Sequence, residues 1–169
     1  MRVLIIFKNL VYSLNMLIEK PKIEDLKMIR SVLEQWTESE EVEKYLSRIE
    51  SEINGYTEYS MNFWVIKDKE LVIGVGGLAK PLPIILPLAK TINPGEIKIL
   101  YIDNNHRGKG IGKQMINYLE LEAKNQGYTE LFIRSAERYK DTAYGFYMNI
   151  GYENIYKLEN NMSVFHKII

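Results

Sequence analysis

A glycine-rich run at residues 107–112 has the clearest potential for chemistry in this chain. Its sequence is Arg-Gly-Lys-Gly-Ile-Gly, and Lys113 follows it. The run stands between an alternating apolar segment and a helical pattern, so it joins a strand to a helix. The first turn of a helix offers unpaired N–H groups and partial positive charge, and glycines let this backbone approach a phosphate closely. The run therefore predicts a loop that cradles the phosphates of a nucleotide-type cofactor.

Two familiar phosphate motifs fit the run less well. A Walker loop needs Ser or Thr after Gly-Lys, but Gln114 stands there and Arg107 occupies the place of the first glycine. A dinucleotide loop needs Gly-x-Gly-x-x-Gly and an acidic residue at the end of the next strand. Here the third glycine comes one residue early, and Glu130 opens the next strand. Nucleoside triphosphate chemistry is disfavoured, and a nucleotide-binding oxidoreductase stays as a secondary alternative.

The composition bounds the remaining functions. With 169 residues, 46% of them hydrophobic, the chain is long enough for one domain with a core and too short for two. Lysine plus arginine and aspartate plus glutamate total 22 each, which gives no support for nucleic-acid binding. The absence of cysteine excludes disulfides, thiolate metal sites and a catalytic thiol.

Two further sequence features narrow the class of protein. The two histidines, His106 and His166, are far apart, so we expect no metal site. The apolar start at residues 3–7 ends at Lys8 and is too short for a signal segment or a membrane span. We therefore expect a soluble, cytoplasmic protein without membrane contact.

Hydrophobic periodicity predicts the elements that must position the loop. We expect strands at 16–20, 63–67, 71–79, 96–103, 131–135, 152–158 and 162–167, and helices at 24–36, 39–53, 110–126 and 141–150. This order predicts one α/β (α+β) domain at 16–169 with a mixed sheet, after an N-terminal extension at 1–15. The strands at 96–103 and 131–135 flank a helix and should be parallel neighbours.

Two motifs in this order resemble those of the GNAT N-acetyltransferases. Arg-x-x-Gly-x-Gly at 107–112, after the strand segment Leu100-Tyr101-Ile102, is similar to the acetyl-CoA signature of that family. The pattern Ala143-x-x-Phe146-Tyr147-x-x-x-Gly151-Tyr152 resembles its second hallmark. The resemblance covers residues 16–169. It implies a single GNAT-like domain whose mostly antiparallel sheet contains a central, splayed parallel pair, flanked by about four helices.

The resemblance also implies an activity: acetyl transfer from acetyl-CoA, as cosubstrate, directly to a primary amine with general acid and base help. Tyr147 would be the acid for the leaving thiolate, with Tyr144 in reserve, and Glu96 the candidate base. Pantetheine would pair with the strand before the loop, and a main-chain N–H near Ile102 would stabilise the oxyanion. The implied cofactor-binding residues are Leu100, Tyr101, Ile102, Arg107, Gly108, Lys109, Gly110, Ile111, Gly112 and Lys113.

The acceptor stays open between a small-molecule amine, a peptide and a protein lysine. Lys140 stands where the family often has asparagine, which removes one expected contact to pantetheine. Acidic residues around the first two helices could steer a cationic amine, although solvated helix faces look the same. These are Glu34, Glu38, Glu40, Glu41, Glu43, Glu50, Glu52 and Glu58, and the aromatic candidates for a pocket are Trp36, Tyr45, Tyr56, Tyr59 and Trp64. A non-catalytic acyl-CoA-binding module is the first alternative, and a homodimer stays open.

Overall fold

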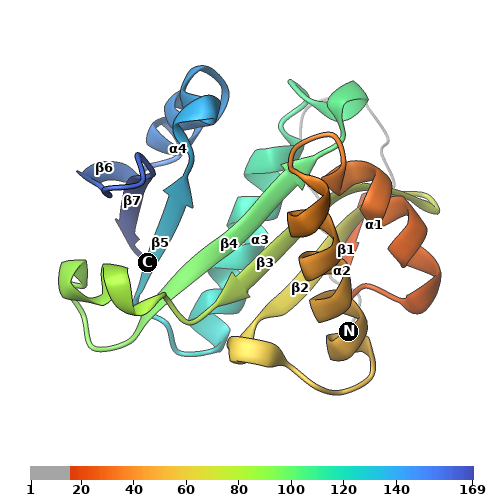
Figure 1. Ribbon diagram of the computed structural model, residues 1–169, viewed down its shortest axis with the longest axis horizontal. Helices are drawn as coiled ribbons and strands as arrows, with labels where there is room; N and C mark the ends of the chain where they lie inside the picture. Colours follow the sequence, from red (N-terminus) through yellow and green to blue (C-terminus); the bar gives the residue numbers. More distant parts are fainter. Residues whose placement is uncertain (1–15) are drawn as a thin grey trace, which may run out of the picture.

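Seven strands form one mixed sheet in the computed structural model, which describes residues 16–169 (Figure 1). The strand order is β1-β2-β3-β4-β5-β7-β6, and β4 and β5 are the parallel pair in it. The predicted fold class is confirmed, whereas the predicted extension at 1–15 lies outside the described residues. The strands are β1 (Met16–Glu19), β2 (Asn62–Asp68), β3 (Leu71–Ala79), β4 (Pro94–Ile102), β5 (Glu130–Ser135), β6 (Glu153–Lys157) and β7 (Ser163–Ile168).

Helices cover both faces of this sheet. The helices α1 (Leu26–Leu33) and α2 (Ser39–Ile53) lie over one face, and α3 (Ile111–Asn125) lies behind the other (Figure 1). The short α4 (Gly145–Asn149) shares the core of α3. Strand β2 reads as a continuous apolar run because its alternating side chains enter both cores. Among the described residues, no helix has the length and apolar character to cross a membrane.

The parallel strands β4 and β5 pair at one end only. Their register runs from Pro94 opposite Glu130 to Ile97 opposite Ile133 and then stops. Strand β4 continues to Ile102 along β3, and β5 continues to Ser135 along β7. The two strands diverge beyond that point, as Figure 1 shows. The expected splay is therefore present, and it leaves one edge of β4 without a neighbouring strand.

A β-bulge lies where the two strands begin to separate. Leu78 pairs with Ile97 and the adjacent Gly77 pairs with Ile99, so Lys98 is an extra residue in β4. A bulge bends its strand and re-aims the side chains that follow. Ile97 accordingly enters the α3 core, whereas Ile99 enters the core under α1 and α2. On β3 this irregularity falls at Gly77, the last of its three glycines.

Two segments differ in detail from the expected elements. The predicted helix at 141–150 is a π-helical turn, Lys140–Tyr144, followed by α4. The proline-rich segment at 80–95 contains a 3-10 turn, Pro83–Leu88, and the first residues of β4. The reason for this turn is burial, because Ile85 is fully buried against Phe132.

Candidate active site

A cleft of about 790 Å³ opens at the splay between β4 and β5. Its walls come from the outer half of β4, the glycine-rich loop, the end of β5, the turn before α4, and the connection between α1 and α2. This volume suits a small molecule of cofactor size. The cleft therefore brings together segments that are more than a hundred residues apart in sequence.

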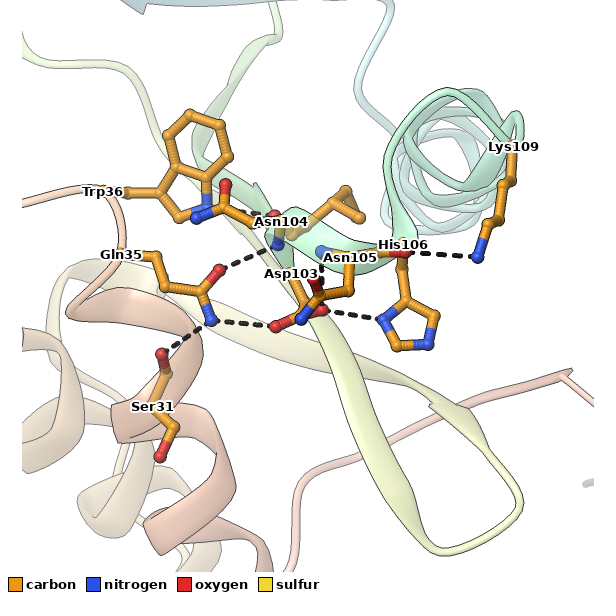
Figure 2. Close-up of polar contacts among 9 residues, drawn as sticks. Ser31, Gln35, Trp36, Asp103, Asn104, Asn105, His106 and Lys109 are labelled. Carbon is orange, nitrogen blue, oxygen red and sulfur yellow. Dashed lines mark hydrogen bonds and ion pairs between the residues drawn. The ribbon is translucent and has the colours of Figure 1, made fainter.

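The glycine-rich loop forms one end of the cleft. Gly108 and Gly110 adopt left-handed backbone with φ of 72° and 76°, and Gly110 caps the start of α3. A Cβ at either position would meet nothing within 4 Å, so only the backbone conformation requires glycine there. The loop thus exposes its amides, and its predicted residues line the cleft except Lys109. The Lys109 ammonium instead donates to the Asn105 carbonyl at 3.1 Å (Figure 2).

The side chain of Trp36 connects this loop to the α1–α2 connection. Its indole N–H donates to the carbonyl of Ile102 at 3.0 Å, and its ring stacks on Tyr101 with centroids 6.0 Å apart. The guanidinium carbon of Arg107 lies 3.2 Å from the centre of the same indole. A cation held this closely over an indole gains a cation–π interaction. The α1–α2 connection and the cofactor loop are therefore in direct contact.

A hydrogen-bonded clamp formed by Gln35 and Asp103 supports the turn before the loop (Figure 2). The Gln35 amide donates to Asp103 at 2.8 Å, and its oxygen accepts from the Asn104 N–H at 2.8 Å. The second Asp103 oxygen contacts His106 Nδ1 at 2.7 Å. Although burial opposes the shift, hydrogen bonds from Gln35 and His106 lower the pKa of Asp103. The ring of His106 is thus held in the turn by Asp103.

Tyr147, the predicted acid, comes from α4 and lines the cleft. Its ring packs on Phe165 with centroids 5.3 Å apart, and its hydroxyl has no hydrogen-bond partner within residues 16–169. Burial raises the pKa of Tyr147, so its phenol keeps its proton at neutral pH. The reserve candidate Tyr144 differs, because its hydroxyl already donates to the carbonyl of Ser135 at 3.1 Å. Of the two tyrosines, Tyr147 has the hydroxyl that is available to a ligand.

Glu96, the predicted base, lies behind two cations. It is 1% exposed, and its carboxylate accepts from Arg134 Nε at 2.7 Å and from Lys98 Nζ at 2.5 Å. The N–H of Leu82 adds a third contact at 3.1 Å. Lys98 and Arg134 line the cleft, whereas Glu96 is not among the described residues that do. These contacts anchor the carboxylate, and its role as a base stays a prediction.

The acidic residues of the first two helices are mostly paired on the outer surface. Glu43 pairs with Arg30 and Glu52 with Lys20, and of the predicted acidic set only Glu41 lines the cleft among the described residues. Within that same part of the chain, no cluster of carboxylates and histidines could hold a metal ion. The cleft therefore lacks the acidic surface that the composition of these helices suggested.

Aromatic and basic side chains line the cleft instead. Of the predicted aromatic residues, Trp36 and Tyr45 line the cleft, whereas Trp64 is buried in the core. The residues that the sequence analysis missed are Lys98 and Arg134, and they lie on the two strands that separate. A search for charged residues on the predicted parallel strands would have found both, because strands buried on both faces are normally apolar.

Comparison with known proteins gives the family of this chain. The acetyltransferase (GNAT) domain model matches residues 60–154, which is more than half of the chain and includes the glycine-rich loop and Tyr147. The chain therefore belongs to the GNAT acetyltransferase family. It is also 29% identical over 106 residues to human N-acetyltransferase 8B, and that match covers 62% of this chain and 41% of the relative.

Solved structures share this fold at low sequence identity. PaiA N-acetyltransferase from Thermoplasma acidophilum, in complex with coenzyme A, is 17% identical with a TM-score of 0.68. A GNAT acetyltransferase from Elizabethkingia anophelis, with acetyl-CoA bound, is 20% identical with a TM-score of 0.61. Each similarity covers 92% of this chain and 99% of the other. At 17% and 20% identity, these comparisons establish that the chain shares the fold of the two structures.

Proposed function

We propose that this chain transfers an acetyl group from acetyl-CoA directly to a primary amine. The observation that carries this proposal is the unpaired edge of β4, which opens into the cleft beyond Ile97 and ends at the glycine-rich loop. An open strand edge can bind an extended ligand by main-chain hydrogen bonds, and a helix N-terminus can bind its phosphates. Acetyl-CoA combines a pantetheine arm with a pyrophosphate, so it matches both features.

The residues predicted from the sequence fit this ligand in two groups. Leu100, Tyr101 and Ile102 supply the strand edge, although the Ile102 carbonyl is already bonded to Trp36. The loop from Arg107 to Lys113 supplies amides and positive charge, with Lys109 contributing its backbone alone. We propose a main-chain N–H near Ile102 as the donor that stabilises the oxyanion. When bound, acetyl-CoA supplies the thioester carbonyl that the amine attacks.

In the proposed reaction, the neutral amine forms a C–N bond to the acetyl carbon and the C–S bond breaks. Tyr147 gives its proton to the leaving sulfur and regains one from the nitrogen, so protons balance. Lys98 and Arg134 favour the neutral form of an amine beside them, because like charges disfavour an ammonium. We therefore propose that Glu96 holds these two cations in place. If Glu96 accepted a proton, it would lose its ion pairs with Lys98 and Arg134.

The variant Tyr147→Phe tests the acid. It keeps the aromatic ring in the core and removes the hydroxyl, so we expect kcat to fall by about 100-fold or more with little change in acetyl-CoA affinity. Free thiol release reports turnover, and calorimetry reports affinity. Full turnover with the wild-type pH profile would remove Tyr147 from the mechanism.

The same assay separates the alternative functions. If acetyl-CoA binds but no amine in a broad panel releases thiol, the chain is an acyl-CoA-binding module. If NADH binds tightly and acetyl-CoA does not, the chain is a nucleotide-binding oxidoreductase. Transfer to at least one amine, with loss in the Tyr147→Phe variant, supports the acetyltransferase.

A further inference from the structure

Three charged side chains meet at the root of the splay. Lys98 is the bulge residue of β4, and Arg134 follows the last residue of β5 that pairs with β4. Both contact the Glu96 carboxylate, and the exposed fractions of the Lys98, Arg134 and Glu96 side chains are 7%, 18% and 1%. Two cations and one carboxylate are thus held almost free of water at the wall of the cleft.

This group carries one positive charge that its surroundings do not neutralise. Of the other charged residues that line the cleft near it, Glu41 and Lys44 pair with each other. Tyr45 also lines this end, and burial, together with the charge of Glu41, raises its pKa to about 12, so it stays neutral. A charge that is removed from water without a partner is costly. The group therefore has a place for an anion.

Part of the Arg134 guanidinium is unused, and Arg134 lines the cleft. Arg134 contacts Glu96 through Nε, and its two Nη groups donate no hydrogen bond within residues 16–169. A guanidinium has a planar fork of donors that matches a carboxylate. Lys98 can add a third donor, because only one contact of its ammonium is occupied by Glu96. Together these donors could hold a carboxylate with more than one charge-assisted hydrogen bond.

The location of the group separates it from the cofactor phosphates. The free edge of β4 runs from Lys98 at the root of the splay to Ile102, and the phosphate loop follows only at 107–112. The pantetheine arm proposed above lies between these two ends. Leu82 and Met162 line the cleft together with Lys98 and offer apolar contact. The anion at the root therefore belongs to the acceptor.

We infer that the acceptor is a primary amine that carries a carboxylate a few bonds away, as an α-amino acid does, and that Arg134 and Lys98 bind this carboxylate. This inference rests on the proposed acetyl transfer and names its substrate class. It disfavours polyamines and aminoglycosides, because each added cation would meet the unneutralised charge of the group.

Matched acceptors test the inference with the wild-type protein. Phenylalanine, phenylalaninamide and 2-phenylethylamine share a side chain and differ in the carboxylate, as do leucine, leucinamide and 3-methylbutylamine. We expect kcat/KM from thiol release to be about 10- to 100-fold higher for each acid than for its amide, the range expected for charge-assisted hydrogen bonds. Equal or higher values for the amides and decarboxylated amines would overturn the inference and leave the acetyltransferase proposal intact.

Variants then assign the preference to the charged group. In Arg134→Gln the acid-to-amide ratio should fall by about 10-fold, mainly through KM. In Glu96→Gln the group gains net positive charge, so the ratio should hold or rise. The ratio is independent of the amount of folded enzyme, so partial unfolding does not obscure the result. Lys124→Gln, which removes an exposed cation of α3, is the control and should leave the ratio unchanged.

Binding measurements distinguish a failure of the carboxylate site from a failure of the acetyl-transfer proposal. If no amine is acetylated, calorimetry with the CoA-saturated protein still compares phenylalanine with phenylalaninamide. Preferential binding of the acid, lost in Arg134→Gln, would support the carboxylate site while the transfer proposal fails. No preference in turnover or in binding, or a ratio that Arg134→Gln leaves unchanged, would refute the carboxylate site.

Discussion

The two ends of the cleft are built in different ways. The end proposed to bind the cofactor consists of main-chain groups from one continuous segment, in which Gly108 and Gly110 set the conformation and α3 begins directly afterwards. The end proposed to bind the acceptor consists of side chains from β4 and β5, held by ion pairs around Glu96. The comparison teaches that the first end depends on backbone geometry and the second on the balance of buried charge. Substitutions in the loop should therefore change acetyl-CoA affinity, whereas substitutions in the charged group should change the free energy of unfolding.

The largest expected effect is on stability at the acceptor end. Glu96→Ala leaves Lys98 and Arg134 without their shared partner, so we expect the free energy of unfolding to fall by roughly 2–4 kcal/mol. The lower value applies because Arg134 is partly exposed to the cleft, where water can solvate its charge once Glu96 is removed. Denaturant unfolding measures the change. Glu137→Ala is the control, because Glu137 pairs with Lys157 on the exposed surface and should cost at most about 0.5 kcal/mol.

At the cofactor end, the expected effect is on affinity. Gly110→Val places a β-branched residue at a φ of 76°, which costs about 1–3 kcal/mol and distorts the loop. We expect acetyl-CoA to bind about 10- to 100-fold more weakly by calorimetry. Gly145→Ala is the matched control, because Gly145 has a φ of −60° and open space around it. Equal affinities in the two variants would mean that the loop conformation does not matter for binding.

Removing the clamp formed by Gln35 and Asp103 should have a smaller effect. Gln35→Ala removes hydrogen bonds to Asp103 and Asn104 that lie near the surface, so we expect a loss of about 0.5–1.5 kcal/mol in stability. Acetyl-CoA affinity should fall only a few-fold, because the loop keeps its glycines. Ser31→Ala keeps the backbone carbonyl that Gln35 uses and should be close to neutral. An unchanged Gln35→Ala protein would show that the clamp is not needed to support the turn.

The smallest expected effect is a pH dependence of the same turn. Asp103 has a lowered pKa in the folded state, so its stabilisation is present above the unfolded pKa and is lost as pH falls through the folded value. As pH falls below about 5, the wild type should therefore lose more stability than Asp103→Asn does. Unfolding free energies at each pH measure the difference. Identical slopes for the two proteins would assign the pH dependence to other groups.

The contrast between the two ends also explains what could be predicted from the sequence. Hydrophobic periodicity predicted the succession of strands and helices along the chain around the loop. The crossover through α3 then required β4 and β5 to be parallel, as they are. The cofactor loop was readable because its residues are consecutive. The cluster of Glu96, Lys98 and Arg134 was not, because it depends on which strands pair and on a one-residue bulge. The π-helical turn at Lys140–Tyr144 was missed because it keeps the apolar spacing of a short helix.

The incomplete pairing of β4 has a consequence for what can enter the sheet. An open strand edge on a protein surface invites pairing with another polypeptide and thus aggregation. Here the open edge lies inside a wedge that closes at Ile97 and Ile133, between the helices of both layers. A second polypeptide strand would bring side chains on alternate sides and would not fit near the narrow end of the wedge. A slender arm with amide groups would fit there, so we expect the splay to select ligands by size as well as to offer an edge for docking.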